Sequence, residues 1–303
     1  MAEEKTNKRF DGVNTDPFAE VQLKQIFNNG RATDKWLTEM RDEQGEWREL
    51  AGTGTVHSEN YRLVSNRQVH DLMTAAISKV AGSGVEFNPI PAFPGSTTGP
   101  VNWTGKRFVE RWYTKDVAIQ PNDGGQVFLG VEARNSYDGD CKVKIGFFSM
   151  HVVCNNQFTS NHLLGQPFTL PHTTAVPDLD ENIDEVIRIV ASKAATFGQT
   201  LGSINKLCDF KFSSPMHRDE FLNECELKTG LVFNDRKIRL ELAGRGITSQ
   251  IPELNLGNKF YADPTSMYGL LQAVSAVNTH DCPGLGGAEK TSRFLDFAIE
   301  YSA

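Results

Sequence analysis

The clearest indication of the fold class is the stretch RNSYDGDCKVKIGFFSMHVVCNNQF, residues 134–158. Its Asp-Gly pair at 138–139 lies between two apolar runs rich in β-branched and aromatic residues, and this is a strong sequence signal for a β-hairpin. A hairpin here favours an antiparallel sheet over a doubly wound parallel one. The second run stops at Cys-Asn-Asn, residues 154–156. This ending indicates either an asparagine turn after a small buried thiol or one wall of a groove.

More strands are predicted before this hairpin. GKRFVERWYTKDVAIQ, residues 105–120, is rich in strong β-formers. GVEFNPIPAFPGSTTGP, residues 84–100, also has β character, but its prolines restrict it to an edge strand or a loop. Tyr61–Val64 is predicted to be a short strand. The middle of the chain is therefore expected to form one antiparallel sheet.

A helix is predicted between these strands, from its cap at Asn66 to Gly82. Asn66 is a suitable N-cap, because its side-chain oxygen can accept hydrogen bonds from the first free backbone N–H groups. Apolar residues follow at helical spacing from Val69 to Val80, and Gly82 and Gly84 end the pattern.

The region before residue 50 is predicted to be helical after a loose, polar arm over residues 1–16. FAEVQLKQIF, residues 18–27, places its apolar side chains on a broad stripe, and DKWLTEMRDEQGEWREL, residues 34–50, continues that pattern on either side of Gly45. We expect residues 17–303 to form a single α+β domain.

The second half of the chain predicts helices. In residues 178–207 an apolar stripe runs without a break from Ile183 to Ile204, which predicts one long amphipathic helix packed on the sheet. Asp178 and Glu181 have the spacing of a capping box at its start. Further helices are expected from Ser214-Pro215 to about residue 227 and in two closing segments, residues 266–280 and 289–302. The loop DCPGLGGA, residues 281–288, would separate the closing pair.

Composition is that of an ordinary globular chain. The 303 residues are 39% hydrophobic and carry a net charge of -7, which provides no global attraction to nucleic acid or anionic membranes. The 5 cysteines form no CxxC pair, which indicates free thiols in a reducing compartment. The N-terminus shows no apolar signal core, and no apolar run reaches the ~20 residues of a membrane span. We expect a cytoplasmic protein, in the host cytoplasm if it is phage-encoded, with no membrane contact.

Catalytic and metal-binding patterns are weak. Neither GxSxG nor HExxH occurs, and the histidines are not spaced with cysteines or acids as metal ligands. GLGGAEK, residues 284–290, lacks the spacing of a phosphate-binding loop and is better interpreted as a connection between helices. We therefore expect no cofactor and no metal, and the sequence leans towards a protein without enzymatic activity.

Basic and aromatic residues interleave around the predicted hairpin. This pattern is typical of sequence-tolerant single-strand binders, in which cations meet phosphates and rings stack on bases. It is equally the pattern of a solvated sheet face, and neighbouring acids nearly balance the bases. The candidate nucleic-acid-binding residues are Lys106, Arg107, Arg111, Arg134, Lys142, Lys144, Arg188, Lys193, Trp103, Trp112 and Tyr113.

Three ordered segments of the chain resemble the phage/plasmid-like family known as domain of unknown function 932. These segments are residues 54–73, residues 133–158, and residues 262–281 followed by EKTSRF. The resemblance covers about residues 53–300. The positions that match the family's motifs are Asn135, Ser136, Asp138, Gly139, Cys154, Asn155, Tyr268, Gly269 and Ala273.

The chain also departs from the family pattern. His151 stands where the family usually has arginine, Asn156-Gln157 replaces Asn-Gly-Leu, and His280-Asp281 appears in reversed order. If the family's arginine contacts a ligand, the site is altered here. The resemblance supplies no reaction, but it implies a setting in phage or plasmid DNA metabolism.

The sequence favours a homo-oligomeric protein that binds single-stranded DNA, and that anneals or recombines it by analogy with the annealing fold. One alternative is a nucleotide- or nucleic-acid-modifying enzyme, with a pocket lined by Asp138, His151, Cys154 and Asn155. Another is a structural or host-interaction protein without a ligand, in which the same residues are turn and core.

Overall fold

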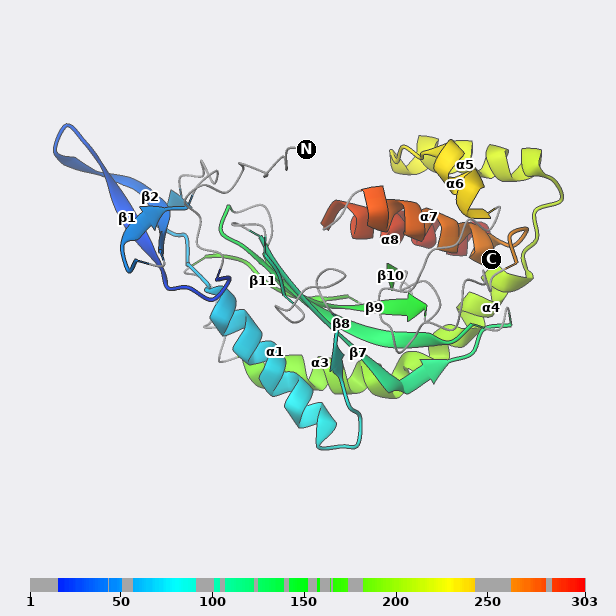
Figure 1. Cartoon of the computed structure of the whole chain (residues 1–303), viewed down its shortest axis with the longest axis horizontal. Coiled ribbons are helices and arrows are strands. Elements are labelled where there is room, and N and C mark those ends of the chain that lie inside the picture. Colours follow the sequence, from blue (N-terminus) through cyan, green and yellow to red (C-terminus); the bar gives the residue numbers. More distant parts are fainter. Residues whose placement is uncertain are drawn as a thin grey trace, which may run out of the picture.

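The computed structural model describes residues 16–42, 44–50, 57–90, 101–103, 107–122, 125–138, 142–151, 157–158, 164, 166–173, 182–242, 263–281 and 285–302. These residues form two antiparallel sheets, and most of the helices come after the strands in the chain (Figure 1). The predicted α+β class, with a central antiparallel sheet and helices at the C-terminus, is confirmed.

The larger sheet is built around the predicted hairpin. Its strands follow the order β10-β9-β8-β7-β5, with β11 also on β9 and β6 also on β7. The central hairpin is β8, Val127–Ser136, with β9, Val143–His151. The other strands are β5 Asn88–Pro89, β6 Val101–Trp103, β7 Arg107–Ile119, β10 Gln157–Phe158 and β11 Phe168–Leu170. The short β5 is an edge strand, as its proline predicted.

The two faces of this sheet differ in chemistry. Leu129, Val131 and Ala133 of β8 belong to the main hydrophobic core, together with residues of the helices. The residues between them face the opposite way, because side chains alternate along a strand. On that second face, Gly130 lies under the ring of Phe148, so that a Cβ at Gly130 would come within 2.2 Å of the ring.

One layer of helices packs on the apolar face. It consists of α1, Asn66–Ala81, and α3, Ile183–Thr196, which lie side by side on the same side of the sheet (Figure 1). The N-cap of α1 is Ser65, in a capping box with Gln68, so the prediction that Asn66 caps it was wrong. Asn66 is instead the first helical residue.

The predicted long helix is divided in three. The 3-10 segment η3, Phe197–Thr200, separates α3 from α4, Leu201–Asp209. Phe197 and Ile204 of the predicted stripe are fully buried, so the apolar stripe continues across the break. The proposed capping box at Asp178 and Glu181 lies outside the described residues, and α3 starts after Asn182.

The C-terminal helices form a second group. They are α5 Pro215–Thr229, α6 Asp235–Leu242, α7 Met267–Asp281 and α8 Leu285–Tyr301. The side chain of Ser214 caps α5 by accepting from the His217 N–H, as its Ser-Pro start predicted. In contrast, residues 285–288 belong to α8, so the loop predicted over residues 281–288 was too long. Figure 1 shows the large sheet between α1 and α3 on one side and α7 and α8 on the other.

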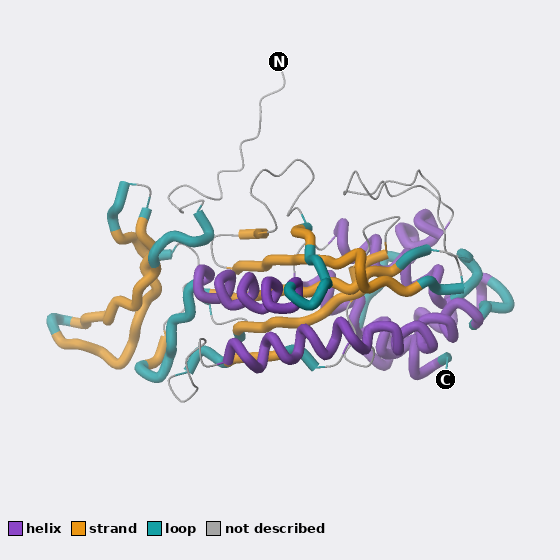
Figure 2. Tube along the Cα trace, turned by 90° about the horizontal axis from the view of Figure 1, so that it is seen from below, coloured by secondary structure: helices purple, strands orange, loops and turns teal. Residues whose placement is uncertain are grey.

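The region predicted to be helical before residue 50 is a second sheet. Its strands are β1 Val21–Asn28, β2 Arg31–Arg41, β3 Trp47–Glu49 and β4 His57–Ser58. The turn between β1 and β2 is Asn29-Gly30, and both residues have positive φ. This is the geometry of a two-residue hairpin loop. The β1–β2 hairpin projects from one end of the molecule (Figures 1 and 2).

Between the two sheets, the short strand predicted at Tyr61–Val64 is reduced to one β-bridge. Tyr61 pairs with Thr173, and residues 62–65 lead into α1 without strand pairing. Tyr61 stacks on His57 of β4 and lies next to the ring of His172. This aromatic group ties β4 to the segment after β11.

Candidate nucleic-acid interface

The strand register brings several predicted cations to one face of the large sheet. Arg111 pairs with Glu132, and Arg134 pairs with Lys144. Side chains opposite each other on neighbouring strands share a face, so these residues and Arg107, four positions before Arg111, project from the side away from α1 and α3. We call this side of β7, β8 and β9, with Arg107, Arg111, Arg134 and Lys144, the cation face.

A buried carboxylate organises its centre. Glu132 is paired with Arg111, at 3.0 Å, and with Arg134, and both its carboxylate oxygens are used. Burial alone would raise the pKa of Glu132, but the two guanidinium groups outweigh burial and hold its pKa below the ordinary value. Glu132 is therefore ionised at neutral pH, and the triad of one carboxylate with two guanidinium groups carries a net positive charge.

Solvent reaches the cation face at the end nearest the Asp138 turn. Arg107 is ion-paired with the buried Asp138 at 3.4 Å, and its side chain remains 38% exposed. Lys144 is half-buried, and Lys142, just before β9, is exposed. Arg134 and Arg111 lie deeper, with side chains 9% and 22% exposed.

The predicted stacking residues do not join the cations. Tyr113 shares their face but is only 3% exposed, because it packs with Ile90, Phe128 and neighbouring residues in a small hydrophobic cluster. Trp112 projects from the helix-covered face and donates its indole N–H to Glu110 at 2.8 Å. The prediction that Tyr113 and Trp112 offer stacking surfaces beside the cations is therefore wrong. For Trp103 the structure describes the backbone alone, in β6.

The remaining predicted cations lie elsewhere. Arg188 and Lys193 are on α3, behind the apolar face, so the sheet separates them from the cation face. Arg188 is 71% exposed and pairs with Glu185 of its own helix. Lys193 is half-buried, and burial lowers its pKa. Lys106 lies outside the described residues.

The matched Asn-Ser-x-Asp segment has a structural role at the end of β8. Asn135 donates from its amide to the backbone oxygen of Val64 and to the side chain of Asn66, each at 2.9 Å. Tyr137, one residue after β8, accepts a hydrogen bond from the backbone N–H of Asn66 at 2.8 Å. Ser136 is also fully buried. These contacts fix the start of α1 against the sheet. Gly139 lies outside the described residues.

The described residues do not bring together the pocket considered for an enzyme. His151 pairs with Val127, at the opposite end of β8 from Asp138. Asp138 follows Val127 by eleven positions, or about 35 Å at the usual rise of a strand. Asp138 and His151 therefore cannot line one small pocket, and Cys154 and Asn155 lie outside the described residues.

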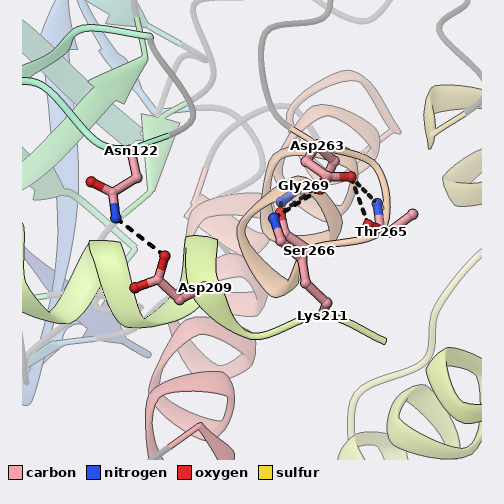
Figure 3. A network of polar contacts seen from close by, with 7 residues as sticks. All are labelled: Asn122, Asp209, Lys211, Asp263, Thr265, Ser266 and Gly269. Atoms are coloured by element: carbon pink, nitrogen blue, oxygen red, sulfur yellow. Dashed lines mark hydrogen bonds and ion pairs between the residues drawn. The ribbon is translucent and has the colours of Figure 1, made fainter. Parts of the chain in front are cut away.

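The late Tyr-Gly motif lies at the start of α7, where backbone segments come very close. Ser266 accepts from the Gly269 N–H at 2.9 Å and donates to the Asp263 carbonyl oxygen at 2.8 Å (Figure 3). A Cβ at Gly269 would lie 2.1 Å from that carbonyl oxygen, so only glycine fits. Lys211 pairs with the Asp263 carboxylate at 2.8 Å, and this hydrogen bond, followed by those from Thr265, lowers the pKa of Asp263 to about 2. The motif is thus a helix-start structure in this chain.

A buried acid–imidazole pair that the sequence does not predict links α1 to β7. Glu110 of β7 is fully buried, and both its carboxylate oxygens lie 3.0 Å from Nδ1 of His70 on α1. The hydrogen bond that Nδ1 of His70 donates to Glu110 raises the pKa of His70 against the opposing effect of burial. The two residues are forty positions apart with no motif between them, so only the packing of α1 on the sheet reveals the pair.

Within the described part of the chain, no three histidine, cysteine, aspartate or glutamate side chains gather as a metal site would require. None of the described helices has the length and apolar character needed to cross a membrane. Comparisons with family models, with curated proteins and with solved structures found no match to this chain.

Proposed function

We propose that this chain is a nucleic-acid-binding protein of phage or plasmid DNA metabolism that holds single-stranded DNA on its cation face. The observation that carries the proposal is a local excess of positive charge in an acidic protein. Among the described residues of this face, the cations Arg107, Arg111 and Arg134 outnumber the acids Glu132 and Asp138, whereas the whole chain has a net charge of -7. Exposed Lys142 adds to the excess.

The contact is with phosphates. Arg107, Lys142 and Lys144 reach solvent and neutralise phosphates of the DNA strand. Arg111 and Arg134 lie deeper in the sheet and add positive electrostatic potential at this surface. Glu132 keeps these two guanidinium groups in place, as buried arginines require. Because Tyr113 is buried within this face and Trp112 projects from the opposite one, binding depends on charge and varies little with base sequence.

The resemblance of three ordered segments to the phage/plasmid-like family supports the setting in DNA metabolism. Annealing of two complementary strands is the finer form of the proposal. It needs two strands to be held at once, and therefore more than one copy of the cation face in an assembly.

The proposal predicts a selective loss of binding when the exposed lysines are removed. Fluorescence anisotropy of a labelled single-stranded oligonucleotide should show a Kd raised about tenfold or more for a Lys142→Ala/Lys144→Ala double variant, since each lost phosphate contact is worth about 1 kcal/mol. Lys228→Ala is the matched control, because Lys228 is an exposed lysine paired with Glu224 on α5, and α5 does not contribute to the cation face. It should bind like the wild type.

Equal affinity of the double variant and the wild type would refute the cation face as the binding surface. An Arg188→Ala variant then distinguishes two outcomes. Loss of binding in that variant would place the site on α3, and no binding by any form of the protein would reject nucleic acid as the ligand.

A further inference from the structure

The β1–β2 hairpin, residues 21–41, is a projecting arm. Its distal half extends beyond the other strands, because β3 pairs only with residues 39–41 of β2 and β4 only with residues 35–36 (Figure 1). Phe27, close to the tip, is 63% exposed. A two-stranded ribbon is at best marginally stable in water. Since the distal half of this arm has only two strands and exposes apolar surface, a further strand would stabilise it.

Within the described part of the chain, the outer edge of β1 offers backbone groups that no other strand pairs. The Arg41 N–H donates to the Glu20 carbonyl oxygen, which makes Val21 and Met40 a non-hydrogen-bonded pair. Since the pattern alternates along an antiparallel ladder, the N–H and C=O groups of Leu23 and Gln25 point away from β2. The two-residue turn at Asn29-Gly30 makes the backbone N–H and C=O groups of Phe27 point away from β2 as well. Among the described residues, β2 is the only neighbour of β1.

The edge carries little that would repel another strand. β1 is eight residues long, VQLKQIFN, with no proline and a single charge at Lys24. That charge has a partner within the arm, because Lys24 pairs with Glu39 of β2 at 2.8 Å. Proteins normally protect exposed edge strands with several charges or with proline. Because β1 lacks this protection, its outer edge can pair with another strand.

We propose that β1 pairs antiparallel with β1 of a second copy of this chain, about a twofold axis at Gln25. The two arms then form one four-stranded sheet, in the order β2-β1-β1-β2. The interface is isologous, as in most homodimers.

The register follows from hydrogen bonding and charge. Outward-pointing residues must pair with each other, so the axis passes through a residue and not between two residues. An axis at Gln25 places Leu23 opposite Phe27 of the second copy, and Lys24 opposite Ile26. An axis at Lys24 would place two lysines directly opposite each other, which is destabilising. Centring on Gln25 therefore joins apolar side chains and separates like charges.

Analytical ultracentrifugation without nucleic acid tests the pairing independently of the cation face. The wild type should shift from the 33.6 kDa monomer to twice that mass as its concentration rises. Protein concentrations from about 1 to 100 μM cover a micromolar Kd, which is expected for so small an interface.

Phe27→Asp and Leu23→Pro should both stay monomeric. Leu23→Pro removes an outward N–H without breaking a bond to β2, so it tests the backbone pairing itself. Val232→Asp, at an exposed apolar position after α5, is the control and should dimerise.

Cysteine cross-linking tests the register. Copies of Gln25→Cys meet at the axis with Cα atoms about 5.5 Å apart, within the range for a disulfide, whereas Lys35→Cys on β2 lies outside reach. We expect oxidation to trap a covalent dimer of Gln25→Cys well above the wild-type background and none of Lys35→Cys. A wild type that stays monomeric throughout, or a dimer that both arm variants leave unchanged, overturns the proposal.

Discussion

At the scale of single residues, the motifs that suggested a site are explained by packing. Asn135 and Tyr137 fix the first residue of α1, and Gly269 lets the chain pass over the Asp263 carbonyl. The sequence predicted the hairpin correctly because a turn is a local feature. It could not predict what Asn135 binds, because Asn66 lies sixty-nine positions away.

Replacing Gly269 with alanine should destabilise the protein by about 2 kcal/mol, because the new methyl group overlaps the Asp263 carbonyl and the start of α7 must shift. Urea unfolding followed by circular dichroism measures the change. Gly202→Ala in α4 is the control, since a Cβ there meets no atom within 4 Å. That variant should be as stable as the wild type or up to about 1 kcal/mol more stable, through better helix propensity.

Replacing Glu132 with alanine should lower the free energy of unfolding by about 3 kcal/mol or more, because Arg111 and Arg134 would remain charged without their carboxylate. Chemical denaturation provides the comparison. Glu185→Ala removes an exposed partner of Arg188 and should change stability by less than about 0.5 kcal/mol. Equal effects of the two variants would mean that the triad does not organise the sheet.

At the scale of elements, the sequence predicted the central strands and the later helices but not the first sheet. The apolar side chains in residues 18–27 fit a helical stripe as well as they fit a half-buried strand. The Asn29-Gly30 pair that follows is the feature of the sequence that indicates a hairpin. The break at Phe197–Thr200 was also hidden, since the apolar stripe continues through it.

The contact between α1 and β7 should make stability depend on pH. The pKa of His70 is raised in the folded protein, chiefly by its hydrogen bond from Nδ1 to Glu110 and further by Asp71, whereas burial and Arg67 oppose the shift. A raised folded pKa means that the stabilisation is complete below the ordinary value of 6.5 and is lost as the pH rises through the folded pKa.

Urea unfolding at pH 6 and pH 8 measures this dependence. From pH 6 to pH 8 the free energy of unfolding should fall by on the order of 1 kcal/mol more in the wild type than in Glu110→Gln, because the variant lacks the carboxylate that stabilises protonated His70. A Glu110→Gln variant with the same pH dependence as the wild type would show that another group is responsible.

At the scale of the whole molecule, the layers decide which charges can act together. The alternation of side chains along β7, β8 and β9 could be predicted from the sequence, and it correctly separates Val143 from Lys144. Which side α3 covers could not be predicted, because that depends on how the helix connects to the sheet. The structure therefore keeps Arg188 and Lys193 apart from the cation face, and it buries Tyr113 within that face.

The most direct test of the account is the salt dependence of single-stranded DNA binding. If Arg107, Lys142 and Lys144 each neutralise a phosphate, log K should fall linearly with log salt concentration with a slope of about -2, and the Lys142→Ala/Lys144→Ala variant should show a slope shallower by about 1 or more. Anisotropy titrations over a series of salt concentrations give both slopes. A wild-type slope near zero, or no binding at the lowest salt concentration, would contradict the proposal that the cation face holds nucleic acid.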